Sequence, residues 1–419
     1  MFNKTFSLLC LLAASSAGFA QGSGFSATYK VDGASIKNEN RSHVALESVE
    51  PNSSVVYATN GVDLIMSYVR LNKTSGAPYE PDFRETGCNS ALLADGGSKI
   101  TLEFSDVNSH TSQADAISAV GEGTLIKIND GNIRISRAGS AGVNASNGGK
   151  VTLENTAIYS YSSQDPSLYT CPGGTIEAID IRGDNVGQAS PAFYSQGDIS
   201  VKESKLSSSK WSIGSVDGGK LTLFKNELRS GGVSGFLLYG SKKRSENGEL
   251  ILDKNRLTVN DGPLFMVTNT SASITLSAND IITKSGELIR VCSDDWGDKG
   301  SNGGNAVLNV NKQKLKGTVY VDSISSLTVN LKKGSQLTGH MNSTENRCAR
   351  TKVVLSAGSS WKSKGNSYIT SIVFEQPLEK GLKQLKGKHV IYYDPSDPDN
   401  AYLEGKEYKT GGGVLRPLK

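Results

Sequence analysis

The sequence contains little proline, few aromatic residues and, after its first twenty residues, no long hydrophobic run. Only 11 of its 419 residues are proline and 7% are aromatic, whereas glycine occurs 46 times. Ser, Thr, Asn and Gly recur in short clusters between alternating apolar residues. This composition indicates many short strands and tight turns, and it argues against a fold built from amphipathic helices. Because no later segment holds about 20 consecutive apolar residues, we expect no transmembrane helix.

An excess of one charge and the residues of a metal centre are also missing. The chain has 45 basic and 41 acidic residues, interspersed, for a net charge of +4. A nucleic-acid-binding surface would need a basic stripe with interleaved aromatic residues, so we expect no nucleic-acid partner. The chain has only four histidines and no closely spaced cysteines. We therefore expect no metal site and no cofactor.

Residues 1–20 have the pattern of a secretory signal peptide. Lys4 supplies the positive charge, residues 6–14 are apolar, and Gly18-Phe19-Ala20 places small residues at the cleavage position before Gln21. We therefore expect a protein that is secreted or displayed at the cell surface, with the periplasm as the alternative location.

One pattern recurs along the chain, with apolar residues at positions i, i+2 and i+7 and a small polar residue at i+5. Copies begin at Ile100, Val151, Ile199, Leu221, Leu250, Ile274 and Leu308. Apolar residues two apart share one face of a strand, and the polar residue marks a bend. From residue 199 to residue 274 the copies begin 22, 29 and 24 residues apart. Two or three short strands with their turns fill such a spacing, which is one coil of a β-solenoid.

The repeat predicts an all-β protein with a single parallel β-helix over residues 55–387. The mature chain would form ~15 coils and a rod of ~70 Å, because coils stack about 4.8 Å apart. Asn226, Asn255 and Asn279 would stack as a ladder along the core wall. A β-sandwich array is the alternative, which the absence of a linker disfavours.

Both ends of a solenoid expose unpaired strand edges and need a cap. Residues 21–54 are polar and irregular, and we expect them to form the N-terminal cap. Residues 388–419 depart from the repeat, and a strand near Tyr392 followed by a hairpin that turns near Glu404-Gly405 would form the C-terminal β cap.

Four cysteines remain after removal of the signal peptide, namely Cys88, Cys171, Cys292 and Cys348. An even number in an exported chain indicates disulfides. Three pairings are possible. We favour Cys88–Cys171 and Cys292–Cys348, because stacked coils bring residues that are near in sequence near in space. Four independent thiols are the alternative.

Residues 298–374 carry motifs that describe coil architecture. They are Gly300–Gly304, Val321–Leu327, Leu331–Ser335, Ser359–Trp361 and Gly365–Ser371. In these motifs the chain resembles bacterial secreted and surface proteins with a pectin-lyase-like right-handed parallel β-helix, similar to the passenger regions of autotransporter adhesins. Such adhesins end in a translocator barrel, whereas no run of alternating, aromatic-girdled strands precedes Lys419. We therefore expect that this chain does not secrete itself.

The best candidate site is the segment Asp294-Asp295-Trp296-Gly297-Asp298. Paired carboxyl groups can serve as general acid and base at a glycosidic bond, and a tryptophan ring can hold a sugar. Neighbouring strand residues point to opposite faces, however, so Asp294 and Asp295 converge only if the chain turns between them. The further Asp, His and Arg-x-Lys motifs of polygalacturonases are absent. We therefore predict no catalytic residue, and we assign Asp294, Asp295, Trp296 and Asp298 as candidate glycan-binding residues.

A second charged segment contains Asp180, Arg182 and Asp184. A pectate lyase would need clustered carboxylates for calcium and an arginine base on one face. Nothing pairs with these residues at a recognisable spacing, so we interpret the segment as a solvated turn.

These patterns favour an exported, non-enzymatic protein that presents its long β-helix to a glycan or a host-cell surface, as adhesin passengers do. The alternative is a polysaccharide lyase or glycoside hydrolase that acts on acidic glycans. Loss of turnover on Asp295→Asn would distinguish the enzyme from the binding protein. The patterns predict no oligomeric state.

Overall fold

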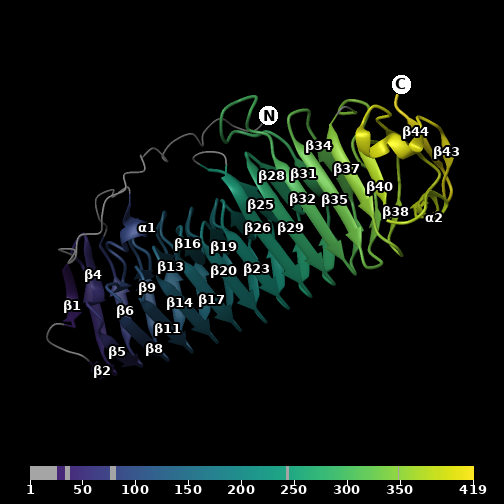
Figure 1. Ribbon diagram of the computed structural model, residues 1–419. Coiled ribbons are helices and arrows are strands. Elements are labelled where there is room, and N and C mark those ends of the chain that lie inside the picture. The colour runs from purple at the N-terminus through teal and green to yellow at the C-terminus, as the bar shows by residue number, and fades with distance from the viewer. Residues whose placement is uncertain (1–25, 34–37, 76–81, 242–244, 348) are drawn as a thin grey trace.

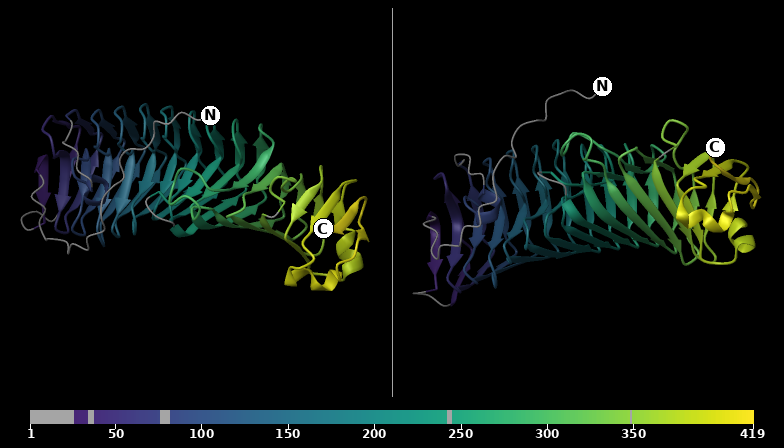
Figure 2. Two further views of the ribbon diagram at one scale, coloured as in Figure 1. Left: turned by 90° about the horizontal axis from the view of Figure 1, so that it is seen from above. Right: turned by 45° about the horizontal axis from the view of Figure 1, so that its top comes forward.

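The computed structural model describes residues 26–33, 38–75, 82–241, 245–347 and 349–419. The chain winds into one long rod, from the purple N-terminal coils to the yellow C-terminal coils (Figure 1). Figure 2 shows that the rod curves gently towards its C-terminal end. The predicted signal peptide lies outside the described residues.

Three parallel sheets form the walls of the rod. Sheet A has 12 strands, from β1 (Ser26–Asp32) to β34 (Thr318–Val321). Sheet B has 14 strands, from β2 (Asn38–Ser42) to β40 (Ser371–Phe374), and sheet C has 10, from β3 (Ala45–Ser48) to β30 (Asp280–Thr283). Each strand pairs with the strand one coil further along the chain, which confirms the predicted all-β solenoid.

The apolar positions of the repeat point into the core. Ile100 and Leu102 lie on β8 (Lys99–Glu103) of sheet B, Val107 lies on β9 (Asp106–Ser109) of sheet C, and all three are buried. The other copies behave alike, except that Ile281 is only partly buried at the end of sheet C. Alternation along the strands of sheets B and C therefore sets which of their side chains face inward, whereas most strands of sheet A are buried on both faces.

The bend between sheets B and C places a left-handed residue before the polar position of the repeat. Lys225, Lys254 and Ala278 have φ values of 55°, 56° and 53°. The asparagine of each of these copies stands one residue later. Non-glycine residues in the left-handed region cost about 1–2 kcal/mol each, so the neighbouring ladder must stabilise the bend.

The predicted asparagine ladder is confirmed. The backbone N–H and the side-chain amide of Asn226 donate to Oδ1 of Asn255 at 2.9 and 3.0 Å. Asn255 donates in the same way to Asn279, at 2.9 and 3.0 Å. Ser204 and Gln313 extend the ladder at its two ends. Stacked amides thus satisfy buried backbone groups at every bend.

The irregular N-terminal cap predicted for residues 21–54 is wrong for the residues that the structure describes. β1 pairs in parallel with β4 (Ser53–Thr59), β2 with β5 (Asp63–Ser67) and β3 with β6 (Arg70–Lys73). These residues therefore form the first coil. The sequence pattern did not indicate this coil, because the outermost coil has few apolar residues to bury.

The described residues contain no disulfide, and the favoured Cys88–Cys171 pair is not formed. Cys88 precedes β7 (Leu92–Ala94), whereas Cys171 follows β16 (Leu168–Thr170), three strands further along sheet A. Three coils correspond to ~14 Å, whereas a disulfide joins Cα atoms less than about 7 Å apart. Cys348 lies outside the described residues, so the Cys292–Cys348 bridge stays a prediction.

The C-terminal cap contains the expected strand but not the expected hairpin. β42 (Val390–Tyr393) pairs in parallel with β39 (Ser367–Ile369) and so extends the coils. The 3-10 helix η1 (Pro398–Leu403) follows, because Pro398 favours a helical start and Asp397 caps it. The antiparallel hairpin comes later, between β43 (Tyr408–Lys409) and β44 (Val414–Pro417).

Truncation after Gly387 should leave the coils folded but make the rods associate end to end. The deletion removes the buried Tyr393, Leu403 and Leu415, which pack in the same core cluster as Ile369 and Ile372. Exposed strand edges and apolar side chains are a template for another chain. Sedimentation velocity should show species larger than those of the untruncated protein. Identical sedimentation of the two proteins would mean that the segment is not a cap.

Candidate functional site

The loop predicted to bind glycans packs against the outer surface of sheet A. It connects β31 (Glu287–Val291) to β32 (Asn305–Asn311). The Trp296 ring packs edge-on against Tyr239, with centroids 4.8 Å apart and an interplanar angle of 61°. The side-chain amide of Asn302 donates to the carbonyl oxygens of Asp294 and Trp296, at 2.5 and 2.9 Å. Trp296 therefore anchors the loop as well as contributing to its surface.

The carboxyl groups of this loop show no geometry of an acid–base pair. Asp294, Asp295 and Asp298 are exposed. The Asp294 carboxylate accepts a hydrogen bond from the backbone N–H of Asp295 at 2.8 Å, so it turns back on its own loop. Although Asp294 is exposed as a residue, desolvation of its carboxyl group raises its pKa. A glycosidase needs two carboxyl groups that face each other across the bond to be cleaved, and no contact of Asp294 or Asp295 provides that arrangement.

A hollow of about 440 Å³ lies on the outer face of sheet C. It crosses four neighbouring strands, β15 (Ala157–Ser160), β18 (Arg182–Asn185), β21 (Lys205–Ser208) and β24 (Glu227–Ser230). We call it the face C groove. Its lining consists of Tyr159, Arg182, Gly183, Asp184, Lys205, Leu206, Ser207, Glu227 and Arg229.

A glycine occupies a core position in the middle of the groove. Gly183 pairs with Ile158 on one side and with Leu206 on the other, in a column that is otherwise aliphatic. A Cβ atom at Gly183 would lie 1.9 Å from the carbonyl oxygen of Ile158. The β18 backbone therefore comes closer to its neighbour than a side chain would permit, and we attribute the hollow in the face to this approach.

The groove has three basic and two acidic side chains. Glu227 accepts from Lys205 at 3.3 Å and from Arg229 at 3.2 Å, and these contacts, with that of Arg229 first, lower the pKa of Glu227. Asp184 accepts a hydrogen bond of 2.5 Å from the Ser207 hydroxyl. A carboxyl group with a lowered pKa stays ionised near neutral pH, so Glu227 is a poor general acid.

Arg182 is the cation of the groove that the protein itself does not neutralise. No ion pair joins its guanidinium to a residue in the described ranges, whereas Lys205 and Arg229 share Glu227. Arg182 is exposed, and Lys205 is its neighbour in the next coil. Adjacent positive groups on one face favour an anionic ligand.

An aromatic and apolar shelf borders the charged part of the groove. The rings of Tyr159 and Tyr161 lie 6.4 Å apart at 19°, and Tyr161 is 54% exposed. Val186, which is 37% exposed, follows β18 as Tyr161 follows β15. Aromatic faces next to charged hydrogen-bonding groups are the combination that holds a sugar ring.

The interpretation of residues 180–184 as a turn is therefore wrong in part. Asp180 does stand at a bend, with φ 53°, but Arg182 and Asp184 lie on β18 and point outward. The repeat was missed here because its copy reads Ile176, Ala178, Ile181 and Gly183, without a polar residue at the bend and with glycine at the last position. The i, i+2, i+5, i+7 spacing of these four residues was the signal that could have identified this coil in the sequence.

Comparison with known proteins bears on the fold. Residues 124–282 match the family model described as a right handed beta helix region, and these residues include the whole face C groove. The match and the coil architecture support a β-helix family. No match was found among curated proteins. No helix in the described ranges is long and apolar enough to cross a membrane.

Proposed function

We propose that this chain is an exported, non-enzymatic protein that binds glycans on a host or cell surface through the face C groove. The observation that carries the proposal is the groove itself, in which Arg182, whose guanidinium forms no ion pair with a described residue, lines the same hollow as Tyr159 of the aromatic shelf. The signal-like residues 1–20 support export. The resemblance to adhesin passengers supports a binding role.

The ionic contacts of the groove favour binding over hydrolysis. Its two carboxylates already accept hydrogen bonds from Ser207, Lys205 and Arg229. Glu227 orients the two basic side chains towards a ligand, and its lowered pKa leaves it little capacity to donate a proton. The basic groups outnumber the acidic groups by one, so an acidic oligosaccharide is the favoured ligand.

Arg182→Gln should weaken the binding of uronic-acid oligosaccharides at least tenfold. A charge-assisted hydrogen bond contributes about 1.5–3 kcal/mol, and about 1.4 kcal/mol corresponds to a factor of ten. Tyr159→Ala should weaken the binding of neutral and acidic oligosaccharides alike, because it removes part of the shelf. A glycan array followed by calorimetry on the mature protein measures both effects.

The matched control is Arg70→Gln on β6, which lies on sheet C three strands before the groove and pairs with Asp106 at 3.6 Å. Its affinity should equal that of the unmodified protein. The proposal fails if no glycan binds, or if all three variants bind alike. Depolymerisation of an acidic glycan that Asp295→Asn abolishes would replace the binding function with the enzymatic alternative.

A further inference from the structure

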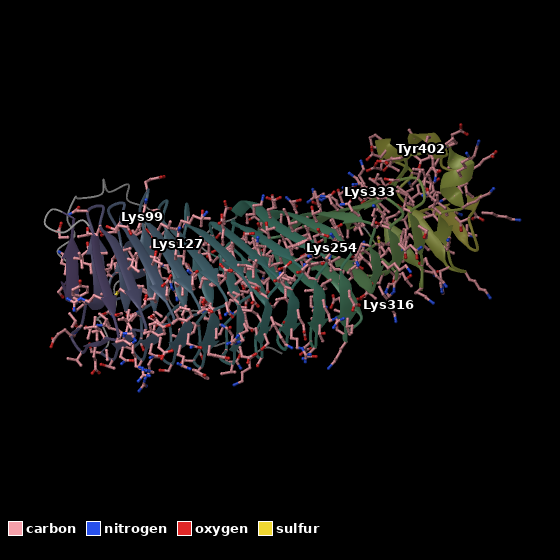
Figure 3. The ribbon with its side chains drawn as sticks, turned by 90° about the horizontal axis from the view of Figure 1, so that it is seen from below. Lys99, Lys127, Lys254, Lys316, Lys333 and Tyr402 are labelled. Atoms are coloured by element: carbon pink, nitrogen blue, oxygen red, sulfur yellow. The ribbon has the colours of Figure 1, made fainter. Side chains whose placement is uncertain are left out.

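The outer face of sheet B carries a patch whose residue pattern is complementary to itself. Five consecutive strands contribute, namely β26 (Ser245–Asp253), β29 (Thr270–Ser277), β32, β35 (Ser326–Lys332) and β37 (Arg350–Leu355). Their register runs without a shift across the outward positions used here. This side of the rod is shown with its side chains in Figure 3, where Lys254 and Lys333 mark the bends that border β26 and β35.

Two parallel columns of outward side chains define the patch, which we call the face B patch. One column is Glu249, Ser273, Val307, Thr328 and Lys352. The other is Ile251, Thr275, Asn309, Asn330 and Val354. All ten side chains are at least partly exposed, and they alternate with buried core residues.

The first column has an acid at one end, a base at the other and valine at its centre. The second column has an aliphatic residue at each end and asparagine at its centre. A two-fold axis that runs along β32, in the plane of contact, reverses the order of the coils but keeps each column opposite itself. Glu249 of one copy then faces Lys352 of the other, Ile251 faces Val354, and Asn309 faces Asn309.

We propose that the face B patch is an interaction surface for a second copy of this chain, which forms an antiparallel, two-fold symmetric dimer. Like charges would lie at the same level if the rods ran parallel, because the coils of both copies would follow the same order and Glu249 would approach Glu249 while Lys352 approached Lys352. The antiparallel arrangement places opposite charges together at both ends of the patch, and it keeps uncharged side chains between them.

The ion pairs within each chain are compatible with this contact. Glu249 already pairs with Lys220 at 2.9 Å, and Lys352 with Asp399 at 2.6 Å. All four side chains remain between 37% and 44% exposed. In the dimer these pairs would join into a row of alternating charge, from Lys220 and Glu249 of one copy to Lys352 and Asp399 of the other.

The size of the patch indicates a weak dimer. Five strands at about 4.8 Å span ~24 Å. The contact would extend one outward position to each side of the two columns, over the seven-residue length of β32, which spans ~23 Å at about 3.3 Å per residue. Each copy would bury ~550 Å², which gives ~1,100 Å² in total and lies at the low end of specific interfaces. The patch contains few apolar side chains, with Val307 38% exposed at its centre. We therefore expect a monomer–dimer equilibrium at micromolar protein.

Charge reversal tests the symmetry directly. Sedimentation equilibrium of the mature protein should give a dimer, and Glu249→Lys or Lys352→Glu should each weaken it at least tenfold. The double variant Glu249→Lys/Lys352→Glu should regain affinity to within about threefold of the unmodified protein. The double variant keeps the intramolecular repulsions of both single variants, so its recovery can come only from the contact between copies.

A second variant probes the centre of the patch without touching any ion pair. Val307→Lys brings two lysines together on the two-fold axis and should abolish the dimer, whereas Thr152→Lys on β14 (Lys150–Glu154), outward on sheet B but outside the patch, should not. Circular dichroism would verify that both variants are folded. A monomeric unmodified protein, a dimer that resists Val307→Lys, or a double variant without recovery would each overturn the proposal.

Discussion

Leu223→Asp should abolish folding of the central coils and lower the melting temperature of the whole rod. Leu223 lies on β23 (Lys220–Phe224), is fully buried, and stacks between Val201 and Leu252 of the neighbouring coils. Burial of an unpaired charge costs several kcal/mol even after relaxation. Because each coil contacts only its neighbours, a defect in one coil removes the support of both adjacent coils, and the damage spreads along the rod.

The matched control for this variant is Thr222→Asp, one residue earlier on the same strand but outward-facing. It should change the melting temperature by only a few degrees. Thermal unfolding followed by circular dichroism compares the two variants. If Leu223→Asp melts at the temperature of the unmodified protein, the assignment of inward and outward positions is wrong.

The protein should lose stability as the pH rises from about 4 to 8, because two buried aspartates resist ionisation. Asp115 lies 3.7 Å from Nε of Arg84, on the short helix α1 (Phe83–Thr86), and accepts from the backbone N–H of Ala141 at 2.6 Å. Asp165 accepts from the backbone N–H of Ser140 at 3.0 Å. Both aspartate side chains are fully buried.

Burial is the largest cause of the raised pKa of both aspartates. It raises the pKa of Asp115 to about 6, against the opposing attraction of Arg84, and the pKa of Asp165 to about 7. These values exceed the ordinary value of 3.8, so the folded state binds more protons than the unfolded state. The stabilisation is complete below about pH 4, and it is lost as the pH rises through 6 to 7. A difference of one pKa unit corresponds to about 1.4 kcal/mol, so a loss of several kcal/mol is expected.

Urea unfolding at pH 4.5, 6 and 8 measures this loss, and Asp165→Asn tests its origin. The amide keeps an acceptor for Ser140 but carries no charge, so this variant should be more stable than the unmodified protein at pH 8. Its stability should vary less with pH. The exposed Asp63→Asn serves as control and should leave the profile unchanged. A profile of Asp165→Asn that matches that of the unmodified protein would contradict this account.

The face C groove illustrates why a site can escape sequence analysis although the fold does not. The i, i+2, i+5, i+7 pattern identified seven coils in which leucine, isoleucine or valine fills the inward positions, but it passed over Ile126, Ile128 and Ile133, whose bend carries Gly131. It failed at Gly183, where the lack of a side chain both interrupts the pattern and coincides with the hollow. Tyr159, Arg182 and Glu227 are spread over 69 positions of the chain, and only their shared register on sheet C brings them together.

The candidate glycan-binding loop is visible in the sequence, whereas its structural environment is not. Asp294, Asp295 and Trp296 attract attention in sequence because they are adjacent, but the environment of Trp296 depends on Tyr239, which is 57 residues earlier. Contacts of this kind come from neighbouring coils and leave no local signal. The Cys88–Cys171 pairing was wrong for a related reason, since nearness in sequence does not specify how many coils separate two cysteines.

The sequence by itself determined the solenoid, the inward side chains and the asparagine ladder, because the same short spacing of apolar and polar residues recurs in one coil after another and places equivalent residues above one another. Only the tertiary structure decided where the outer faces are hollow, which charges are neutralised, and which side chains stand in one column. These properties depend on the register between coils, in which residues 19 to 36 positions apart become neighbours. The groove around Arg182 and the symmetric columns of the face B patch therefore became visible only when the coils were stacked.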